Sequence, residues 1–540
     1  MEDKYGILAL DLGTSGAKAA IVSLTGECRA WAMAPVPVIL KGRNGAEQDP
    51  LAWWQAVDHS ATRAMAQSPI ARERILAVCT SSMGEETVAV DRNGTPLMNA
   101  LNWMDQRGAN AIKKQLRGWI NPLGIGYGVK NLLQWIWYTG GIPSPSGKDP
   151  AGHIAYIRDH CPEIYDKTYK FLNSLDFINL KLTGEFTATQ DSALPLWATN
   201  NRNPEHVRYQ PSLVRALGID PEKLPELVTS TTVLGRLRAA LAQDWGLPQT
   251  TKVVAGSVDT TAATIGSGAV RDFDPCLTLG TSSFITAHVP FKKTDIINNM
   301  ASFPSARPGK YLLMNNQTTA GGCLSHMADH IVYHRDELLQ EEKRPDLYKV
   351  FDSIAERVPP GSNGLVYTPW LFGERAPMDD HTIRGSIHNI SLDNTREDMV
   401  RAVFEGVAMN SRWLMDGVKK FLKHPCKDLR MAGGGATSAV WCQIYADVLN
   451  CRIHQSRAPI RCNARGAAFL GAVGLGKLEF DAIPRRAPVC WVYSPNPELR
   501  GLYDDRFARF KEFYTKTRSI FGRLNAQKGD SHAGPHAPTA

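Results

Sequence analysis

Short apolar runs separated by turn residues open the chain and predict a meander of β-strands. These runs span residues 5–10, 17–23 and 28–39. A helix is predicted next, over residues 50–66, because apolar residues recur there at helical spacing, at Trp53, Val57 and Ala61. Two further strands are predicted after it, at residues 76–80 and 87–90.

The middle of the chain, from about residue 110 to residue 245, is richer in helix signals, proline and tryptophan, and predicts a large helical insertion. An apolar run at residues 252–256 predicts the strand that begins a second half. The elements expected there are a helix over residues 395–420, a strand and a glycine turn, a helix over residues 439–449 and a small-residue helix over residues 466–472. From residue 525 onward the composition indicates a disordered tail.

Length and composition limit the classes of protein that fit. A chain of 540 residues is too long for one core and predicts two or three domains. The net charge of +8 comes with no dense Lys/Arg block, so nucleic acid is not expected as a partner. The ten cysteines are scattered and predict reduced thiols. No signal peptide and no membrane-spanning run is recognised, and a cytoplasmic protein is expected.

The four residues Leu-Gly-Thr-Ser occur at positions 12–15 and again at positions 279–282. Each copy adjoins apolar residues, and each predicts a hairpin whose tip offers backbone N–H and hydroxyl donors to an anion. Only the first copy has Asp11 before it and Lys18 after it. A carboxylate for magnesium and an ammonium for phosphate belong together in phosphoryl transfer. Two related halves holding a polyphosphate are therefore predicted; the alternative is a chance repeat, with Asp11 capping a surface turn.

Two later motifs add candidate chemistry. Gly256-Ser257-Val258-Asp259 places a carboxylate at the end of a strand, where Asp259 would accept the proton of a substrate hydroxyl. The alternative for Asp259 is a helix N-cap. The turn Gly433-Gly434-Gly435 would let a flat ligand lie against bare backbone, with a simple loop as the alternative.

The order of these motifs resembles the FGGY carbohydrate kinases, xylulokinase-like members of the actin-like ATPase superfamily. The resemblance extends over about residues 5–476. It includes Gly-Gly-Gly-Ala-x-Ser-x-x-Trp-x-Gln-x-x-Ala-Asp at residues 433–447 and Gly-Glu-Arg-Ala-Pro at residues 373–377. The chain departs from the family pattern at Asn389, where a glycine is usual, and at Leu133, where a tryptophan is expected.

The resemblance implies an α/β fold of two ribonuclease H-like (actin-like ATPase) domains, with ATP and the sugar in a cleft between them. The implied division is an N-terminal, sugar-binding domain at 1–250 that carries the helical insertion, a C-terminal, ATP-binding domain at 251–490, a helical extension at 491–524 and a disordered tail at 525–540. Asp259 would be the catalytic base, and Asp11 would hold Mg²⁺ through water. The phosphate-binding residues would be Gly13, Thr14, Ser15, Lys18, Gly280 and Thr281, and the adenosine-binding residues Gly433, Gly434, Gly435 and Ser438.

Substrate identity is expected to depend on two loops. Met83 and Glu85 lie at the position of the family's sugar-reading loop, where Glu85 replaces the histidine of bacterial xylulokinases. Trp103 and Asp105 match the family's Trp-x-Asp-x-Arg loop and are expected to contact the sugar. A pentulose such as D-xylulose is the first expectation, and ribulose, a tetritol, gluconate or a glycerol-like polyol is the alternative. A homodimer is a further expectation. A sugar-sensing protein of the same fold and an actin-like filament protein are the non-enzyme readings.

Overall fold

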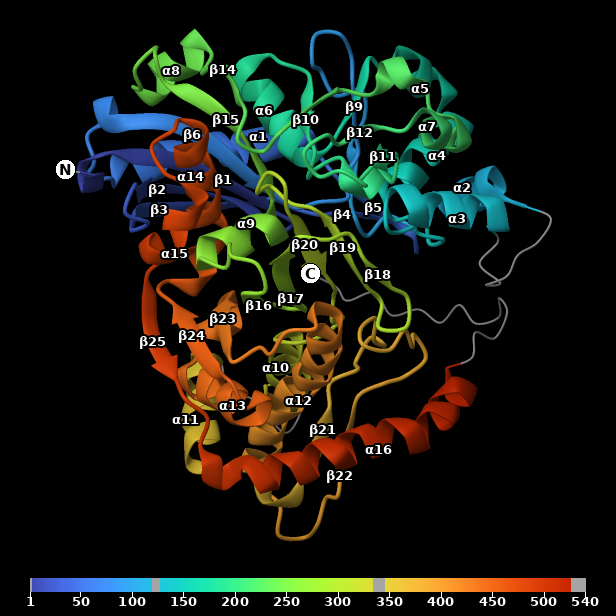
Figure 1. Ribbon diagram of the computed structural model, residues 1–540, viewed down its shortest axis with the longest axis vertical. Helices are drawn as coiled ribbons and strands as arrows, with labels where there is room; N and C mark the ends of the chain where they lie inside the picture. The colour runs from blue at the N-terminus through green and yellow to red at the C-terminus, as the bar shows by residue number, and fades with distance from the viewer. Residues whose placement is uncertain (1, 119–126, 334–344, 526–540) are drawn as a thin grey trace.

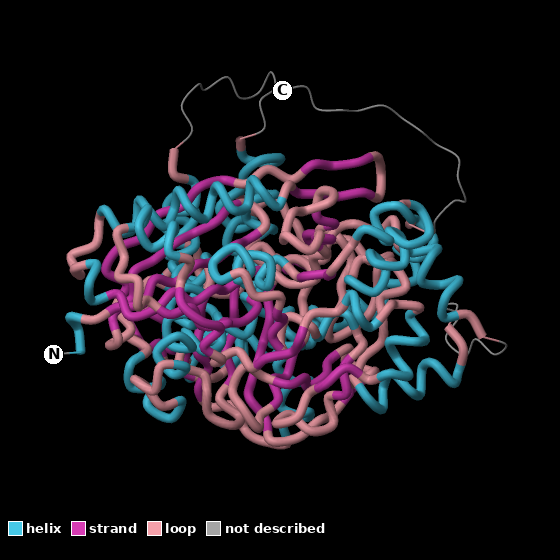
Figure 2. Tube along the Cα trace, turned by 90° about the horizontal axis from the view of Figure 1, so that it is seen from above, coloured by secondary structure: helices cyan, strands magenta, loops and turns pink. Residues whose placement is uncertain are grey.

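The computed structural model describes residues 2–118, 127–333 and 345–525. Two mixed sheets, each with helices packed against it, form its upper and lower parts (Figure 1). Seen from above, the sheets lie among helices, and one end of the molecule is mostly helix and loop (Figure 2). Each sheet contains a hairpin with a glycine at its tip, and candidate site residues lie at these tips. The arrangement of the sheets therefore determines where those residues lie.

The first sheet is built around the N-terminal hairpin and has the strand order β14-β15-β6-β1-β2-β3. Strand β1 pairs antiparallel with β2 and parallel with β6, and β6 pairs parallel with β15. The predicted meander is thus present, although its first strand runs three residues further than predicted and its third ends at Pro35, four residues early. The strands are β1 (Gly6–Gly13), β2 (Gly16–Ser23), β3 (Cys28–Pro35), β6 (Ile75–Ser82), β14 (Val233–Arg236) and β15 (Lys252–Val258).

Both faces of β1 are buried, and alternate residues face different helices. Leu8 and Leu10 pack with Trp53 of α1 (Pro50–Ala66), which has the predicted bounds and is capped by Asp49. The intervening residues Ile7 and Ala9 pack with helix α14 (Cys462–Gly474) in a separate cluster. Residue 11 has the same parity as residues 7 and 9, so Asp11 lies on the face of the sheet that carries α14.

Most of the helices predicted for residues 110–245 lie between the fourth and fifth strands of this sheet, and those within residues 109–167 and 211–217 are on the right of Figure 1. The last one follows the fifth strand and lies at the upper left. The helices are α2 (Ala109–Leu116), α3 (Val129–Tyr138), α4 (Pro150–His160), α5 (Pro162–Lys167), α6 (Ser174–Thr183), α7 (Pro211–Leu217) and α8 (Ala239–Trp245). Short strands before and between these helices make small two- or three-stranded sheets. These strands are β4 (Ile39–Lys41), β5 (Gly45–Gln48), β7 (Val88–Val90), β8 (Ala100–Leu101), β9 (Lys170–Leu172), β10 (Thr187–Thr189), β11 (Thr199–Asn200), β12 (Arg208–Tyr209) and β13 (Glu226–Val228).

The second sheet has the order β18-β19-β20-β17-β16-β23-β24-β25. Its centre repeats the pattern of the first sheet, because the hairpin β16–β17 pairs through β16 with the parallel strand β23. The strands are β16 (Pro275–Leu279), β17 (Ser283–Val289), β18 (Thr294–Asp295), β19 (Met300–Pro304), β20 (Tyr311–Met314), β23 (Asp428–Ala432), β24 (Arg452–Ser456) and β25 (Val489–Tyr493).

Helices cover this sheet and share its core. The helix predicted over residues 395–420 is α12 (Arg396–Leu422), which begins at a capping box between Thr395 and Asp398. The helix predicted over residues 439–449 has those bounds as α13 (Ala439–Leu449). The other elements of this part are α10 (Gly322–His326), α11 (Leu347–Arg357), α15 (Ile483–Arg486), α16 (Arg500–Leu524) and the small strand pair β21 (Val366–Thr368) and β22 (Ser386–His388).

Helix α9 (Asp259–Ser267) joins the two sheets and packs closely against α14. A Cβ atom added to Gly466 would lie 1.9 Å from the carbonyl oxygen of Ala262, and one added to Gly266 would lie 1.9 Å from that of Cys462. The small-residue helix predicted at residues 466–472 therefore does allow a close backbone approach. This contact holds the segment that follows β15 against a segment near the end of the chain.

The predicted domain bounds need two corrections. Strand β15, which a division at residue 250 assigns to the C-terminal domain, hydrogen-bonds to β6 in the first sheet, and α14 covers a face of the same sheet. The predicted helical extension at 491–524 begins as an edge strand, because β25 pairs with β24, and its helix starts only at Arg500. The predicted tail lies outside the described residues except for Asn525.

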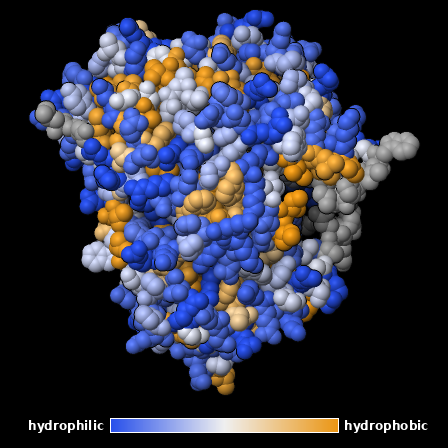
Figure 3. Space-filling model, in the orientation of Figure 1, coloured by the Kyte–Doolittle hydropathy of each residue, from blue (hydrophilic) through white to orange (hydrophobic). Residues whose placement is uncertain are grey.

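All ten cysteines are described and all are free thiols, as predicted. The face of the molecule seen in Figure 3 is mainly hydrophilic, with apolar side chains in separate patches. In the described ranges, none of the helices combines the length and hydropathy needed to cross a bilayer.

Candidate active site

The N-terminal hairpin places a carboxylate and an ammonium opposite each other. Asp11 on β1 is the register partner of Lys18 on β2, and Lys18 Nζ lies 3.2 Å from Asp11 Oδ2. Asp11 is buried and the Lys18 side chain is half-buried; the charge of Asp11 raises the pKa of Lys18. Asn463 of α14 donates to Asp11 Oδ1 over 3.4 Å, a partner that the sequence did not reveal. The pair is held on the face of the sheet that points toward α9 and α14.

The tip of this hairpin is half-buried at Gly13 and Thr14 and exposed at Ser15. Gln48 Nε2 donates to the carbonyl oxygen of Thr14 over 2.9 Å and fixes the backbone of the tip. Gln48 is itself fully buried and accepts a hydrogen bond from Asn102. The tip, with Ser15 exposed, is therefore presented on a supported turn.

The second hairpin tip lies at Gly280 and Thr281, between β16 and β17. The carbonyl oxygen of Thr281 accepts hydrogen bonds from the N–H groups of Ala320 and Gly322, and that of Gly280 accepts one from Gly321. The segment that begins α10 thus supports this tip, a role that no motif indicated. Thr281 is exposed and Gly280 half-buried, so both are accessible to a ligand.

Asp259 is the first residue of α9, directly after β15. It is half-buried, and burial together with the charge of Asp11 raises its pKa to about 6. Thr260 Oγ1 donates to Asp259 Oδ1 over 3.2 Å, and the charge of Lys18 acts in the opposite direction to that of Asp11. The structure therefore brings Asp259, Asp11 and Lys18 together, as the sequence predicted, from three different elements.

The glycine turn after β23 lies against the second hairpin. A Cβ atom on Gly433, whose φ is +88°, would lie 2.5 Å from the carbonyl oxygen of Leu279, the residue before Gly280. Gly435 also packs on Leu279, whereas Gly434 is exposed and faces open space. Ser438 is buried, caps α13 by accepting from Trp441, and donates to Asp352 over 2.6 Å. Gly434 is thus the member of this predicted set with an open surface.

The substrate loop of the sequence analysis reaches the first hairpin. Thr14 Oγ1 accepts a hydrogen bond from Trp103 Nε1 over 3.0 Å and lies 3.6 Å from the sulfur of Met83. The Trp103 side chain remains 38% exposed. Glu85 has a positive φ of 72°, a backbone conformation that is uncommon for a residue with a side chain and is often found at functional sites.

Glu85 faces two cations from different parts of the chain. Burial raises its pKa, and the charges of Arg375 and Lys148 act against that shift. Arg375 belongs to the Gly-Glu-Arg loop, whose Glu374 is buried and accepts from Thr318, Arg375 and Asn410. In the described part of the chain, neither Lys148 nor Arg375 has an ion pair of its own.

Asp105 does not occupy the predicted position at the substrate. It is fully buried, and its carboxylate accepts from the N–H of Ala46 over 2.9 Å and from Arg107. Arg107 also pairs with Glu47, so the carboxylate ties its own loop to β5. With no exposed surface and these partners, Asp105 supports the loop that carries Trp103 and does not present its oxygens to a sugar.

Two buried acids near Asp259 were not predicted. Glu86 accepts from Ser174 Oγ over 3.1 Å through one oxygen, and its other oxygen has no hydrogen-bond partner among the residues that the structure describes. Burial raises the pKa of Glu86 well above its usual range. Asp191 accepts from the N–H of Val258, the residue before Asp259. Glu86 directly follows Glu85 in the sugar-reading loop, which was its only signal in the sequence, and no motif marks Asp191.

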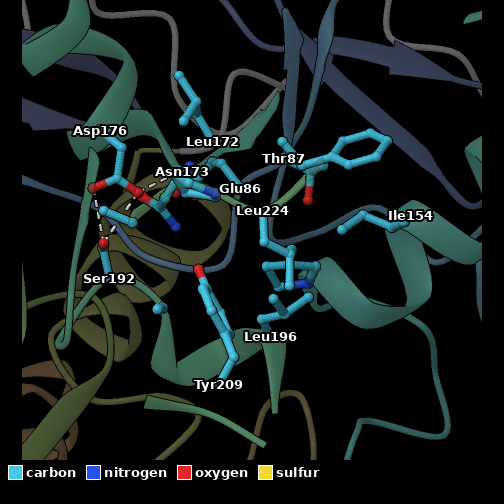
Figure 4. A pocket seen from close by; sticks show the side chains of 15 residues that line it. Glu86, Thr87, Ile154, Leu172, Asn173, Asp176, Ser192, Leu196, Tyr209 and Leu224 are labelled. Carbon is cyan, nitrogen blue, oxygen red and sulfur yellow. Dashed lines mark hydrogen bonds between the residues drawn. The ribbon is translucent and has the colours of Figure 1, made fainter. Parts of the chain in front are cut away.

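A small cavity of about 30 Å³ lies behind Glu86 (Figure 4). The figure shows Glu86 and Asn173 at one side, with Asp176 bonded to Ser192 nearby and the Tyr209 ring facing them. Its volume suits one water molecule. The cavity lies inside the insertion and is too small for a sugar, so it is not the substrate site.

Comparisons with known proteins agree with this geometry. Residues 6–266 match the N-terminal domain of the FGGY family of carbohydrate kinases, and residues 276–475 match its C-terminal domain. A gluconokinase of Bacillus subtilis (strain 168) is 28% identical, covering 88% of this chain and 89% of that protein. A xylulose kinase of Staphylococcus epidermidis is 27% identical, covering 96% of this chain and 99% of that protein.

Solved structures show the same fold. A xylulose kinase from Rhodospirillum rubrum superposes with a TM-score of 0.79 at 25% identity, covering 96% of this chain and 100% of the other. A gluconate kinase from Lactobacillus acidophilus gives a TM-score of 0.81 at 23% identity, covering 96% and 99%. The predicted two-domain actin-like ATPase fold is confirmed.

The fold and the paired hairpins define an ATP-dependent phosphotransferase that acts on carbohydrates. The chain belongs to the FGGY family of carbohydrate kinases.

Proposed function

We propose that this kinase transfers the terminal phosphoryl group of Mg-ATP to a hydroxyl of a pentulose such as D-xylulose, with Asp259 as the general base. The observation that carries the proposal is the position of Asp259, half-buried at the start of α9 and facing the Asp11–Lys18 pair. The relatives named xylulose kinase, matched over nearly their whole length, support the pentulose.

The chemistry of the proposal follows from the environment of Asp259. A carboxyl whose pKa is raised to about 6 is ionised at neutral pH but is a stronger base than an ordinary aspartate. It would orient the attacking hydroxyl and accept its proton. Lys18 and the N–H groups of the tips at Gly13 and Gly280 would hold the phosphates, where fixed donors stabilise charge that develops during transfer. The exposed Gly434 would border the adenosine.

The donor set fits Mg²⁺ only as an ion shared with ATP. In the described residues no group of three or more His, Cys, Asp or Glu side chains could hold a metal, whereas Asp11 supplies one carboxylate. Mg²⁺ is usually bound by one or two carboxylates, waters and substrate phosphates. Asp11 would hold it through water, and the ion would neutralise charge on the phosphates. Homodimer formation and a cytoplasmic location stay predictions.

A second candidate substrate is a sugar acid such as gluconate. Lys148 and Arg375 give the surroundings of Glu85 two cations without ion pairs, which would suit a carboxylate on the substrate. The relative named gluconokinase is consistent with this reading.

A coupled assay of ADP release tests both readings. Wild-type protein with Mg-ATP would be tested with D-xylulose, D-ribulose, D-gluconate, erythritol and glycerol, and D-xylulose should give the highest kcat/KM. Gluconate as the best acceptor, together with an Arg375→Gln variant that raises its KM far more than the KM for xylulose, would replace the pentulose by the sugar acid. No acceptor-dependent ADP release with any of them would contradict the proposed function.

A further inference from the structure

One buried carboxylate spans the turn that carries Asp259. Asp191 Oδ2 accepts a hydrogen bond from the N–H of Val258 over 2.8 Å, and Asp191 Oδ1 accepts one from Thr261 Oγ1 over 3.0 Å. The two donors belong to the residue before Asp259 and to the second residue after it. Asp191 is 3% exposed. A single side chain therefore fixes both ends of the strand-to-helix turn on which the proposed base lies.

The segment that bears Asp191 is itself held rigidly. Asp191 follows β10, and the next residue, Ser192, donates from its N–H to Thr189 Oγ1 over 2.9 Å and from its hydroxyl to Asp176 over 2.8 Å. On α6, Asn179 donates to the carbonyl oxygen of Ala255 in β15 over 2.7 Å. The insertion is thus attached to β15 at two places, and a shift of Asp191 relative to Asp259 would break several hydrogen bonds.

Burying this carboxylate is expensive for the fold. In the described part of the chain it has no ion pair, and its partners are neutral donors, so burial raises its pKa to about 7. A buried ionisable group without a cation costs free energy that an amide or apolar side chain would avoid. Such groups are concentrated at functional sites.

We infer that Asp191 is a positioning residue for phosphoryl transfer, which holds the Asp259 carboxylate in line with the acceptor hydroxyl by fixing residues 258–261. The inference rests on the proposed function of Asp259 as the base and extends it to a residue of the insertion. It also connects the insertion to catalysis, because Asp191 lies in the same segment as Ala188 and Ser192, which line the cavity of Figure 4.

The ionisable groups that face Asp259 are Asp11 and Lys18 on the first hairpin, Glu86 on the substrate loop and Asp191 itself. Because the pKa of Asp191, about 7, lies above that of Asp259, about 6, Asp191 is mostly protonated where Asp259 titrates. Replacing Asp191 with asparagine should therefore leave the acid limb of the pH–rate profile in place, and the effect of the variant should appear in kcat.

The test compares Asp191→Asn with variants that separate positioning from stability. An asparagine has one acceptor oxygen and an NH₂ group that cannot accept from the second donor, so the turn loses a hydrogen bond. With Mg-ATP and D-xylulose we expect kcat to fall roughly 10- to 100-fold, as for a misplacement of about 1 Å, and the KM for ATP to change little. Thr261→Val should lower kcat in the same direction, whereas Thr261→Ser, which keeps the hydroxyl, should retain most of it.

Asp398→Asn is the matched control, because Asp398 is as buried as Asp191 and also accepts from neutral donors, Thr395 and Asn363, but these lie neither in residues 258–261 nor in the segment that bears Asp191. It should lower the melting temperature and keep kcat. Asp191→Asn that keeps kcat would overturn the inference, as would a Thr261→Val variant with full kcat if Asp191→Asn does not fold.

Asp259→Asn, measured in parallel, separates the two proposals. Full turnover in Asp259→Asn would remove the base and with it the positioning role. An inactive Asp259→Asn beside a fully active Asp191→Asn would remove the positioning role alone. Absence of acceptor-dependent turnover in the wild type with all five acceptors of the ADP-release assay would overturn both.

Discussion

Gly466→Ala is expected to disturb both folding and catalysis, because it separates the two helices that join the sheets. The new Cβ atom would lie 1.9 Å from the carbonyl oxygen of Ala262. The obstacle is backbone and cannot rotate away, so the helices must move apart by about 1 Å or more. Overpacking of this kind costs about 1–3 kcal/mol, and a rigid obstacle favours the upper end.

The net effect follows from two opposing contributions. Alanine regains about 1 kcal/mol of helix propensity relative to glycine, which leaves a loss of about 2 kcal/mol. For a domain of this size each kcal/mol lowers Tm by about 2–4 °C, so Tm should fall by roughly 4–8 °C in a thermal unfolding experiment. Because Asp259 is the first residue of the displaced helix α9, kcat should fall as well, by up to about 10²-fold.

Gly501→Ala is the matched control. Gly501 is also helical, in α16, but nothing lies within 4 Å of a Cβ atom added there. That substitution should leave kcat unchanged and raise stability by about 0.5–1 kcal/mol. An unchanged Tm and kcat in Gly466→Ala, with the control behaving as expected, would show that the helices have slack and would refute the packing argument.

Three further predictions concern the site. Glu85→Gln should raise the KM for the sugar by about one to two orders of magnitude, since hydrogen bonds to a charged group are worth roughly 1.5–3 kcal/mol. The KM for ATP should not change, and equal effects on both constants would place Glu85 outside the sugar site. Asp11→Asn should raise the Mg²⁺ concentration needed for half-maximal rate, measured by titration at fixed ATP, and an unaltered Mg²⁺ response would exclude the metal role. Lowering the pH through about 6 should remove activity as Asp259 becomes protonated. Stability should change in the opposite sense, because the pKa values of Asp149 and Asp176 are raised to about 7 in the folded protein. The stabilisation from their protonated forms is complete below the unfolded-state pKa and is lost as pH rises through 7. A Tm that is higher at pH 8 than at pH 6 would contradict this reading.

Local patterns in the sequence predicted the local structure well. The bounds of α1 and α13 follow from periodic apolar positions and caps, and the two Leu-Gly-Thr-Ser segments form hairpin tips because glycine and hydroxyl residues favour that turn. The approach of Asp11, Lys18 and Asp259 could be expected from the family order of the motifs.

Contacts between distant segments that lie outside these motifs could not be predicted. Asp191 meets Val258 across 67 residues and Asn463 meets Asp11 across 452, and neither lies in a recognisable motif. The prediction for Asp105 was wrong because the sequence does not show whether a carboxylate in a motif faces a sugar or an arginine of its own loop, here Arg107. The membership of β15 in the first sheet depends on pairing with β6, which apolar content alone does not specify.

The packing of α14 on the first sheet has a consequence for synthesis on the ribosome. One face of that sheet is covered by Phe469 and Leu470, whereas its strands β1 and β6 are complete by Ser82. About 390 residues therefore separate the strands from the helix that shields them. At about 5–20 residues per second, the apolar face around Ile7 and Ala9 is exposed on the nascent chain for roughly 20–80 s. We therefore expect the N-terminal segment to need protection by holding chaperones until the last seventh of the polypeptide emerges, and a fragment truncated before α14 to aggregate.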